Sequence, residues 1–152
     1  MKNTILFLSF ILISTLTQAQ KLSFDETVNY LNEKISQYES SENVDEKEII
    51  ANKDGFFEKK FKDPTGTQIT NINLKNTEIL AQHDNSLGVI KIYFKCNGDC
   101  TQYYFMKNDG TKSSYNSNAR IAFYFKNKTE AEKVRKAFIH LQSLMKQIKE
   151  PF

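Results

Sequence analysis

The two cysteines, Cys96 and Cys100, are the residues whose spacing is chemically most specific in this sequence. They flank Asn97-Gly98-Asp99, which is typical of the tip of a β-hairpin. If all three residues form the loop, the cysteines lie opposite each other and their Cβ atoms can approach the roughly 4 Å that a disulfide needs. If Asn97-Gly98 alone forms a type I′ turn, Cys100 lies opposite Lys95 and the cysteines face opposite sides of the sheet. We expect the disulfide Cys96–Cys100, because the N-terminal residues predict export to an oxidising compartment.

The spacing of these thiols argues against other cysteine chemistry. A redox-active pair is not expected, since the spacing is not Cys-x-x-Cys and no helix N-terminus follows to lower the pKa of a thiol. Zinc is not expected either, because two thiols and the distant His83 and His140 do not form a recognisable ligand set. The sequence therefore predicts neither a metal nor a cofactor.

No catalytic site is expected from the sequence. His83 beside Asp84 could begin a catalytic relay, but no nucleophile motif accompanies the pair. Gly-x-Ser-x-Gly, His-Glu-x-x-His and a glycine-rich phosphate loop are all absent from the sequence. Five aspartates fall in predicted turns, where local backbone geometry explains them without calcium: Asp54, Asp63, Asp84, Asp99 and Asp109.

Three tyrosines are the candidate binding residues. Tyr103 and Tyr104 fall in a predicted strand, and Tyr115 falls in a loop rich in Ser and Asn. Tyrosine is typical of binding surfaces because its ring is apolar and its hydroxyl group is polar. The alternative is that these rings belong to the core or to ordinary cross-strand pairs.

A strand that leads directly into a long helix is predicted near the C-terminus. The strand is Ala119–Phe125, and Thr129 with Glu132 forms a capping-box pattern after it. Asn127 with Glu130 would serve one turn earlier. The apolar residues of this helix recur at spacings of three and four, and the stripe they form must be covered by a sheet: Ala131, Val134, Phe138, Leu141, Met145 and Ile148.

A second amphipathic helix is predicted near the N-terminus. Ser23 and Glu26 form a capping-box pattern at its start, and the polar run Ser40–Asn43 ends it. We expect this helix to pack on its own domain, and binding of a partner is the alternative. Its apolar face consists of Phe24, Val28, Leu31, Ile35 and Tyr38.

Between the helices the pattern changes to the alternation typical of β-strands. Asp54-Gly55 and Asp63-Pro64-Thr65-Gly66 predict tight turns, and Lys107–Asn118 predicts a polar loop. The two strands beside the cysteines are expected to pair as a hairpin. The predicted fold class is α+β: an N-terminal helix, about seven antiparallel strands in a strongly bent sheet or barrel, and a long C-terminal helix packed on it. The predicted strands are Lys47–Ala51, Phe56–Lys62, Thr67–Leu74, Thr77–Gln82, Val89–Lys95, Thr101–Met106 and Ala119–Phe125.

Residues 1–19 resemble a signal peptide. Lys2 precedes the apolar run Ile5–Ile13, and Thr17-Gln18-Ala19 places small residues where a signal peptidase reads them. The apolar run is too short to span a bilayer as a helix. We expect cleavage after Ala19, no stable membrane insertion afterwards, and a single domain over residues 20–152 with its core at 23–149. A retained amphipathic anchor is the alternative.

Charge and composition restrict the class of partner. The sequence has 21 basic and 18 acidic residues, interspersed throughout, so its net charge of +3 forms no concentrated basic stretch. Nucleic-acid binding proteins usually carry such a stretch, and no nucleic-acid partner is expected.

Seven strands closed by a C-terminal helix resemble the pleckstrin-homology-like superfold. The run Ile121–Val134 looks like the last strand and helix start of such domains, and with Ser23–Ile35 and the signal peptide it resembles small exported bacterial proteins without an assigned activity. The sequence lacks the tryptophan common in that helix. Around its first hairpin it offers Lys53, Lys59, Lys60 and Lys62 without an arginine, so phosphoinositide binding does not carry over. A helix-grip fold is the alternative.

These observations predict an exported, periplasmic or secreted, non-catalytic module that binds a protein, a peptide or an envelope component. The alternative is a carrier of a small apolar ligand or lipid, with a cavity between the sheet and the C-terminal helix. A hydrolase-like enzyme without a recognisable motif comes third. A cavity lined by Phe138, Leu141 and sheet aromatics would favour the carrier, and a solid core would favour the binding module.

Overall fold

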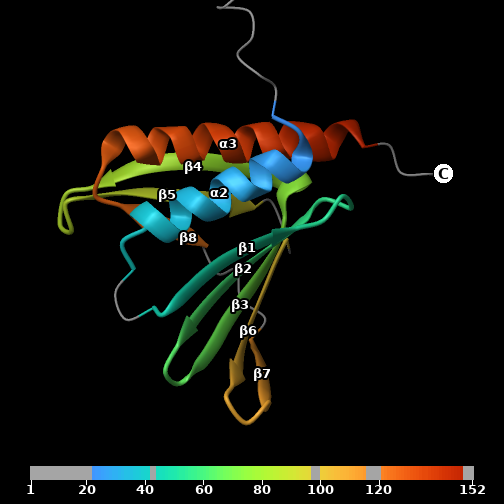
Figure 1. Cartoon of the computed structure of the whole chain (residues 1–152), viewed down its shortest axis with the longest axis vertical. Helices are drawn as coiled ribbons and strands as arrows, with labels where there is room; N and C mark the ends of the chain where they lie inside the picture. Colours follow the sequence, from blue (N-terminus) through green and yellow to red (C-terminus); the bar gives the residue numbers. More distant parts are fainter. Residues whose placement is uncertain (1–21, 42–43, 97–99, 116–120, 149–152) are drawn as a thin grey trace, which may run out of the picture.

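The described part of the chain contains two helices and eight antiparallel strands (Figure 1). The computed structural model describes residues 22–41, 44–96, 100–115 and 121–148. The predicted signal peptide, residues 1–19, lies outside this part. The predicted α+β class, with an N-terminal helix and a long C-terminal helix, is confirmed.

The elements follow the chain in nearly the predicted order. β7 arises within the predicted polar loop 107–118, which gives eight strands instead of seven. In chain order the elements are α2 (Phe24–Tyr38), β1 (Glu46–Ala51), β2 (Phe56–Asp63), β3 (Gly66–Asn73), the 3-10 helix η1 (Leu74–Asn76), β4 (Thr77–Asp84), β5 (Val89–Cys96), β6 (Thr101–Lys107), β7 (Lys112–Tyr115), β8 (Ala122–Phe125) and α3 (Lys128–Gln147).

The strands form two sheets, and within the described residues these do not close into a barrel. One sheet has the order β1-β2-β3-β6-β7 and the other has the order β4-β5-β8. The predicted hairpin between β5 and β6 is wrong, because β5 pairs with β4 and β8 whereas β6 pairs with β3 and β7. Alternation predicts which residues share a face, but it does not select the neighbouring strand.

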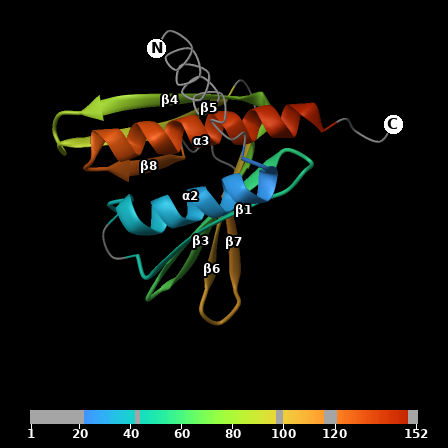
Figure 2. The same ribbon diagram turned by 45° about the horizontal axis from the view of Figure 1, so that its top comes forward.

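The helices join the two sheets. α3 lies along the three-stranded sheet and contacts all of its strands, and α2 contacts both α3 and β1 (Figures 1 and 2). The five-stranded sheet projects away from the helices below α2 in Figure 1. One end of this sheet therefore packs in the core, while the other extends from the body of the domain.

Asn127 is the N-cap of α3. Its side-chain oxygen accepts hydrogen bonds from the backbone N–H groups of Thr129 (2.9 Å) and Glu130 (3.2 Å). Of the two predicted caps, the earlier one is correct. The predicted apolar stripe is confirmed, since all its members are buried except the partly buried Ile148: Ala131, Val134, Phe138, Leu141 and Met145.

α2 begins with the predicted capping box between Ser23 and Glu26 and also covers an open edge of the larger sheet. The Asn32 side chain accepts a hydrogen bond from the Ile49 N–H (2.6 Å) and donates one to the Ile49 carbonyl (2.8 Å). Ile49 lies in β1, which is an edge strand, so these backbone groups have no strand partner on that side. A single amide side chain thus substitutes for a neighbouring strand.

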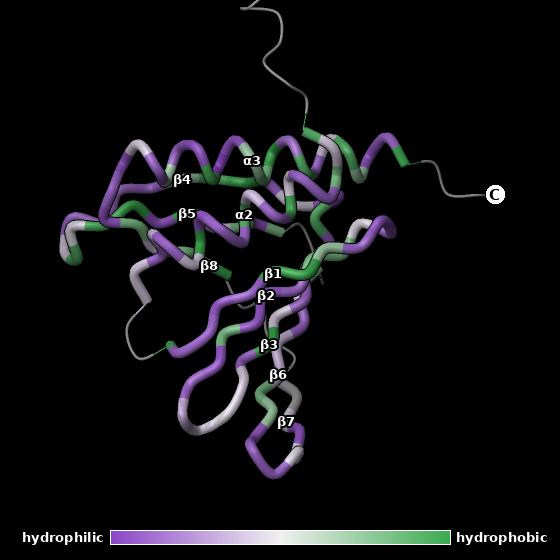
Figure 3. The backbone as a smooth tube through the Cα atoms, viewed as in Figure 1, coloured by the Kyte–Doolittle hydropathy of each residue, from purple (hydrophilic) through white to green (hydrophobic). Residues whose placement is uncertain are grey.

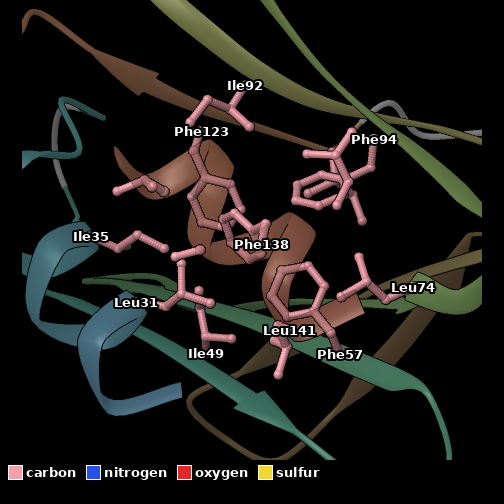
Figure 4. Close-up of a cluster of buried hydrophobic side chains, with 14 of the residues drawn as sticks. Leu31, Ile35, Ile49, Phe57, Leu74, Ile92, Phe94, Phe123, Phe138 and Leu141 are labelled. Atoms are coloured by element: carbon pink, nitrogen blue, oxygen red, sulfur yellow. The ribbon is translucent and has the colours of Figure 1, made fainter. Parts of the chain in front are cut away.

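A cluster of phenylalanines fills the centre of the core (Figure 4). Phe57, Phe94, Phe123 and Phe138 come from β2, β5, β8 and α3, and each is at most 2% exposed. The centroids of contacting rings in this group lie 5.0–6.2 Å apart. These side chains tie both sheets to the C-terminal helix.

Candidate binding site

The five-stranded sheet has an inner face toward the helices and an outer face away from them. Ile49, Phe57 and Ile72 point into the core and are at most 1% exposed. Because successive strand residues point to opposite faces, Ile50 and Phe56 lie on the outer face, where they are 41% and 47% exposed. Much of β1 and β2 is hydrophilic along the chain, as Figure 3 shows. The outer face therefore carries the exposed apolar side chains of Ile50 and Phe56 among polar residues.

The strand register arranges the outer residues in rows across the sheet. Asn73 lies opposite Phe56, and its backbone N–H donates a hydrogen bond to the Cys100 carbonyl (2.9 Å). The next row, read from β1 to β6, is Ile50, Glu58, Asn71 and Gln102. Carboxamide side chains of neighbouring strands are thereby brought together.

A hollow of about 420 Å³ lies over these two rows and is open to solvent. Its volume falls within the roughly 300–1,000 Å³ typical of small-molecule sites. Four carboxamides, one phenyl ring and one cysteine line it: Asn52, Asn71, Asn73, Gln102, Phe56 and Cys100. The hollow combines hydrogen-bonding carboxamide groups with the apolar face of one phenyl ring, and we take it as the candidate binding site.

The four carboxamides do not all have the same role. Asn52 shapes the β1–β2 turn, since its side-chain oxygen accepts hydrogen bonds from the backbone N–H groups of Asp54 (3.1 Å) and Phe56 (3.0 Å). Within the described residues, the side chains of Asn71 and Gln102 make no hydrogen bond to the protein. The Asn73 side-chain oxygen is buried and has no partner there either. A buried acceptor without a partner is unfavourable, so a donor from a ligand would be favourable at this point.

The hollow itself contains no ionised side chain. Glu58 lies in the same row as Asn71, but its carboxylate is paired with the Lys60 ammonium group at 3.1 Å. Lys60 also lies 3.9 Å from Glu48. An anionic or cationic ligand in the hollow would therefore lose hydration without gaining a free counter-charge from the lining. The site is suited to an uncharged polar ligand.

The structure does not bring the three candidate tyrosines together on one face. Tyr103 pairs with Tyr115 in the register of β6 and β7, and Tyr104 pairs with Ser114. Tyr104 therefore lies on the outer face, two residues beyond Gln102, while Tyr103 belongs to the inner face. The Lys112 ammonium group lies 3.7 Å from the centroid of the Tyr104 ring, and burial raises the pKa of the Tyr104 hydroxyl. A ligand role for these tyrosines stays a prediction.

The cysteine pair lies where the chain crosses between the sheets. Cys96 ends β5 and Cys100 precedes β6, and the pair is at disulfide distance with a Cα–Cα separation of 5.9 Å. The intervening residues 97–99 lie outside the described part. The predicted proximity is confirmed, but the pair connects two sheets instead of the two strands of one hairpin. Cys100 also forms part of the wall of the hollow.

The histidines are separated and engaged in local contacts. A ring nitrogen of His83 contacts the side-chain oxygen of Asn85, and His140 Nε2 lies 2.7 Å from the Leu22 carbonyl. Among the described residues, no group of three or more His, Cys, Asp and Glu side chains could hold a metal ion. None of the described helices is both long enough and apolar enough to cross a bilayer.

A second polar cluster lies buried between the end of α2 and the two sheets. The Glu39 side chain is wholly buried, and its carboxylate lies 2.8 Å from the Lys47 ammonium group. It also accepts hydrogen bonds from the Ser41 hydroxyl (2.6 Å) and the Tyr124 N–H (3.1 Å). Burial raises the pKa of the Glu39 carboxyl, but the hydrogen bonds outweigh this, so the pKa lies below its usual value.

Lys59 is the unusual member of this cluster. Its ammonium group donates a hydrogen bond to the Ala122 carbonyl (2.8 Å) and lies 3.9 Å and 4.7 Å from the ring centroids of Phe61 and Phe123. Burial lowers the pKa of this amine to about 8, although the nearby Glu39 acts in the opposite direction. These groups connect β2 to β8 across the two sheets. We expect Lys59 and its contacts to affect the stability of the fold and not the binding of a ligand, since the hollow lies on the opposite face of the larger sheet.

Comparisons with models of protein families, with curated proteins and with solved structures gave no match to this chain.

The residues of the hollow were not predicted as a site, although the sequence holds a signal for them. Asn71 and Asn73 lie two apart in a strand, so they share one face, and Asn is depleted in strands generally. Neither Gln102 nor Phe56 could be added to them from the sequence. Their neighbourhood depends on β6 pairing with β3, which the sequence pattern did not indicate.

Proposed function

We propose that this chain is an exported, non-catalytic binding module that holds a polar component of a peptide, a protein or the cell envelope in the hollow on the outer face of its larger sheet. The observation that carries this proposal is the set of carboxamides around the hollow. Asn71, Asn73 and Gln102 present donors and acceptors that the protein leaves unused within the described residues, beside the exposed Phe56 ring. A few convergent polar groups next to an apolar surface are typical of binding sites.

The packing of the core supports this module over a carrier of apolar ligands. A carrier would need a cavity between α3 and the sheets, lined by Phe138 and Leu141. Both residues are fully buried, and the Phe138 ring contacts the rings of Phe94, Phe57 and Phe123 at 5.0, 5.4 and 5.4 Å. Side chains therefore occupy the space where the carried ligand would lie. A pleckstrin-homology-like or helix-grip relationship remains a proposal about the fold, and it adds no ligand to the site.

The test is a ligand screen with matched surface variants. Thermal-shift measurements against peptides, lipids and envelope extracts should identify a preparation that raises the melting temperature, and the double variant Asn71→Ala with Gln102→Ala should abolish the shift. The control is Asn29→Ala with Gln82→Ala, which removes two exposed amides elsewhere and should leave the shift intact. If both double variants lose the shift equally, or if neither does, the hollow is not the site.

Export is tested separately. The intact mass of protein recovered from outside the cytoplasm should match a chain that begins at Gln20. A recovered protein that still carries residues 1–19 would contradict the predicted cleavage after Ala19.

A further inference from the structure

We infer that the ligand of the hollow is a neutral saccharide chain whose sugar ring stacks on Phe56 while its hydroxyl groups bind the carboxamides of Asn71, Asn73 and Gln102. This inference rests on the proposed function and names the chemical class of its ligand. Four features of the hollow carry it: its neutrality, its hydrogen-bonding groups, the exposed Phe56 ring and the position of its strands.

Neutrality excludes charged ligands from the bottom of the hollow. All lining residues are uncharged, with Cys100 at disulfide distance from Cys96. The nearest carboxylate in the rows, that of Glu58, is paired with Lys60. A phosphate or carboxylate group would lose its hydration and would find no lysine or arginine in the lining. The ligand must therefore use uncharged hydrogen-bonding groups.

The carboxamides suit hydroxyl groups. A carboxamide offers two N–H donors and a carbonyl acceptor, while a hydroxyl group donates one hydrogen and accepts at its oxygen. Two adjacent hydroxyls of a sugar can thus bind one Asn or Gln side chain at both ends. The buried Asn73 oxygen, which lacks a partner among the described residues, would accept a hydrogen bond from one of them.

Phe56 supplies the apolar surface that a sugar ring also requires. Its ring is 47% exposed at the edge of the hollow, because the alternation that buries Phe57 turns the adjacent Phe56 to the outer face. The C–H groups on one side of a pyranose ring form an apolar surface, and an aromatic ring can cover that surface without competing for its hydroxyls. Amides on one side and an exposed ring on the other match both parts of a sugar.

The position of the hollow argues against an extended peptide. Peptides that bind to sheets generally pair their backbone with a free strand edge. The hollow lies over β2 and β3, which have neighbours on both sides, and over the first residues of β6, whose pairing with β7 begins only at Tyr103. Asn32 covers the backbone groups of Ile49 on the β1 edge. A peptide lying over β2 and β3 would thus have its own backbone groups satisfied by side chains alone.

The experiment is a calorimetric titration of the full chain with neutral hexasaccharides of N-acetylglucosamine, β-1,4-glucose, α-1,4-glucose and mannose. The charged comparison is a galacturonic acid hexamer, and the peptide comparison is an uncharged Ser/Ala hexapeptide. We expect at least one neutral saccharide to bind, with at least about tenfold weaker binding of the galacturonic acid hexamer and of the peptide.

Variants at the stacking position locate the saccharide. Phe56→Ala should weaken its binding by about tenfold or more, whereas Phe56→Tyr, which keeps the ring, should stay within about threefold of the wild type. Leu87→Ala is the matched control, because it removes an exposed apolar side chain in a turn away from the hollow and should change nothing.

The outcomes separate this inference from the proposed function. Peptide binding that Asn71→Ala with Gln102→Ala abolishes, without saccharide binding, overturns the saccharide and leaves the binding module standing. Saccharide binding that is unaffected by Phe56→Ala overturns the assigned stacking position. If no neutral saccharide binds up to about 5 mM, the saccharide inference fails, while the proposed function is decided by the thermal-shift screen with the Asn71→Ala, Gln102→Ala variant.

Discussion

Replacing Lys59 by Met should stabilise the protein at neutral pH and lose that effect as the pH rises. Burial lowers the pKa of the Lys59 amine from 10.5 to about 8, and at about 1.4 kcal/mol for each pH unit between these values the buried charge costs about 3 kcal/mol. Met removes the charge and keeps most of the volume. It also leaves the Ala122 carbonyl without the Lys59 donor, which offsets about 1 kcal/mol. The expected net gain at pH 7 is about 1–2 kcal/mol.

The sign of the pH dependence follows from proton binding. Below pH 8 the amine carries its proton in both the folded and the unfolded state, so the cost is fully present. Between pH 8 and 10.5 the unfolded state binds more protons than the folded state, and the wild-type free energy of unfolding rises with pH relative to the variant. The advantage of Lys59→Met should therefore shrink by up to about 1.4 kcal/mol per pH unit and reverse near the upper end of this range.

Urea unfolding of both proteins at pH 7, 8, 9 and 10 measures this difference. The control is Lys62→Met on the outer face of the same strand. The hydrogen bond from Lys62 to Glu46 raises the pKa of that amine, so both of its states keep the proton and the difference should stay flat up to pH 9. A loss of more than about 1 kcal/mol in Lys59→Met at pH 7, or a difference that does not change with pH, would refute the reasoning.

Substitutions at three further places test the fold. Phe138→Ala should lower the free energy of unfolding by about 3–5 kcal/mol, because the side chain is fully buried among three other rings, and a loss below about 1 kcal/mol in urea unfolding would contradict this packing. Asn32→Ala should lower it by about 1–3 kcal/mol, since both backbone groups of Ile49 lose their partner, and Asn32→Asp should lose at least as much, because its second carboxylate oxygen would face the Ile49 carbonyl where the Asn32 amide now donates. The double Ser variant of Cys96 and Cys100 should lose only about 2 kcal/mol because the closed loop is short. Thiol labelling of denatured, unreduced protein should find no free thiol, and two free thiols per chain would refute the bond.

The local elements of this protein could be predicted from its sequence because short-range chemistry determines them. The Ser23 capping box and the α3 stripe follow from spacings of three and four residues. The Asp54-Gly55 turn could be predicted because it requires a backbone conformation that favours glycine. Gly55 has φ +102°, and an added Cβ there would come within 2.8 Å of the Lys75 side chain.

The pairing of the strands could not be predicted in the same way. The strand β5 alternates equally well beside β6 or beside β4 and β8, and long-range packing of Phe94 and Phe123 decides between them. The strand β7 was not predicted within the polar loop 107–118, because this short strand is mostly polar and lacks an alternation of apolar residues. The hollow could not be predicted without the β3–β6 pairing, since only that pairing sets Gln102 beside Asn71. The Lys59 environment also depends on β8 lying across from β2.

The most direct test of the binding site is an NMR fragment screen that follows the side-chain amide signals of ¹⁵N-labelled protein. Small neutral probes with hydroxyl or amide groups should shift the side-chain NH₂ signals of Asn71, Asn73 and Gln102, while the signals of the exposed Asn29 and Gln82 stay in place. The same three signals should move together along one titration curve, because they line one hollow. Shifts confined to other parts of the protein, or no shift of these three signals with any probe, would contradict the assignment of the hollow as the binding site.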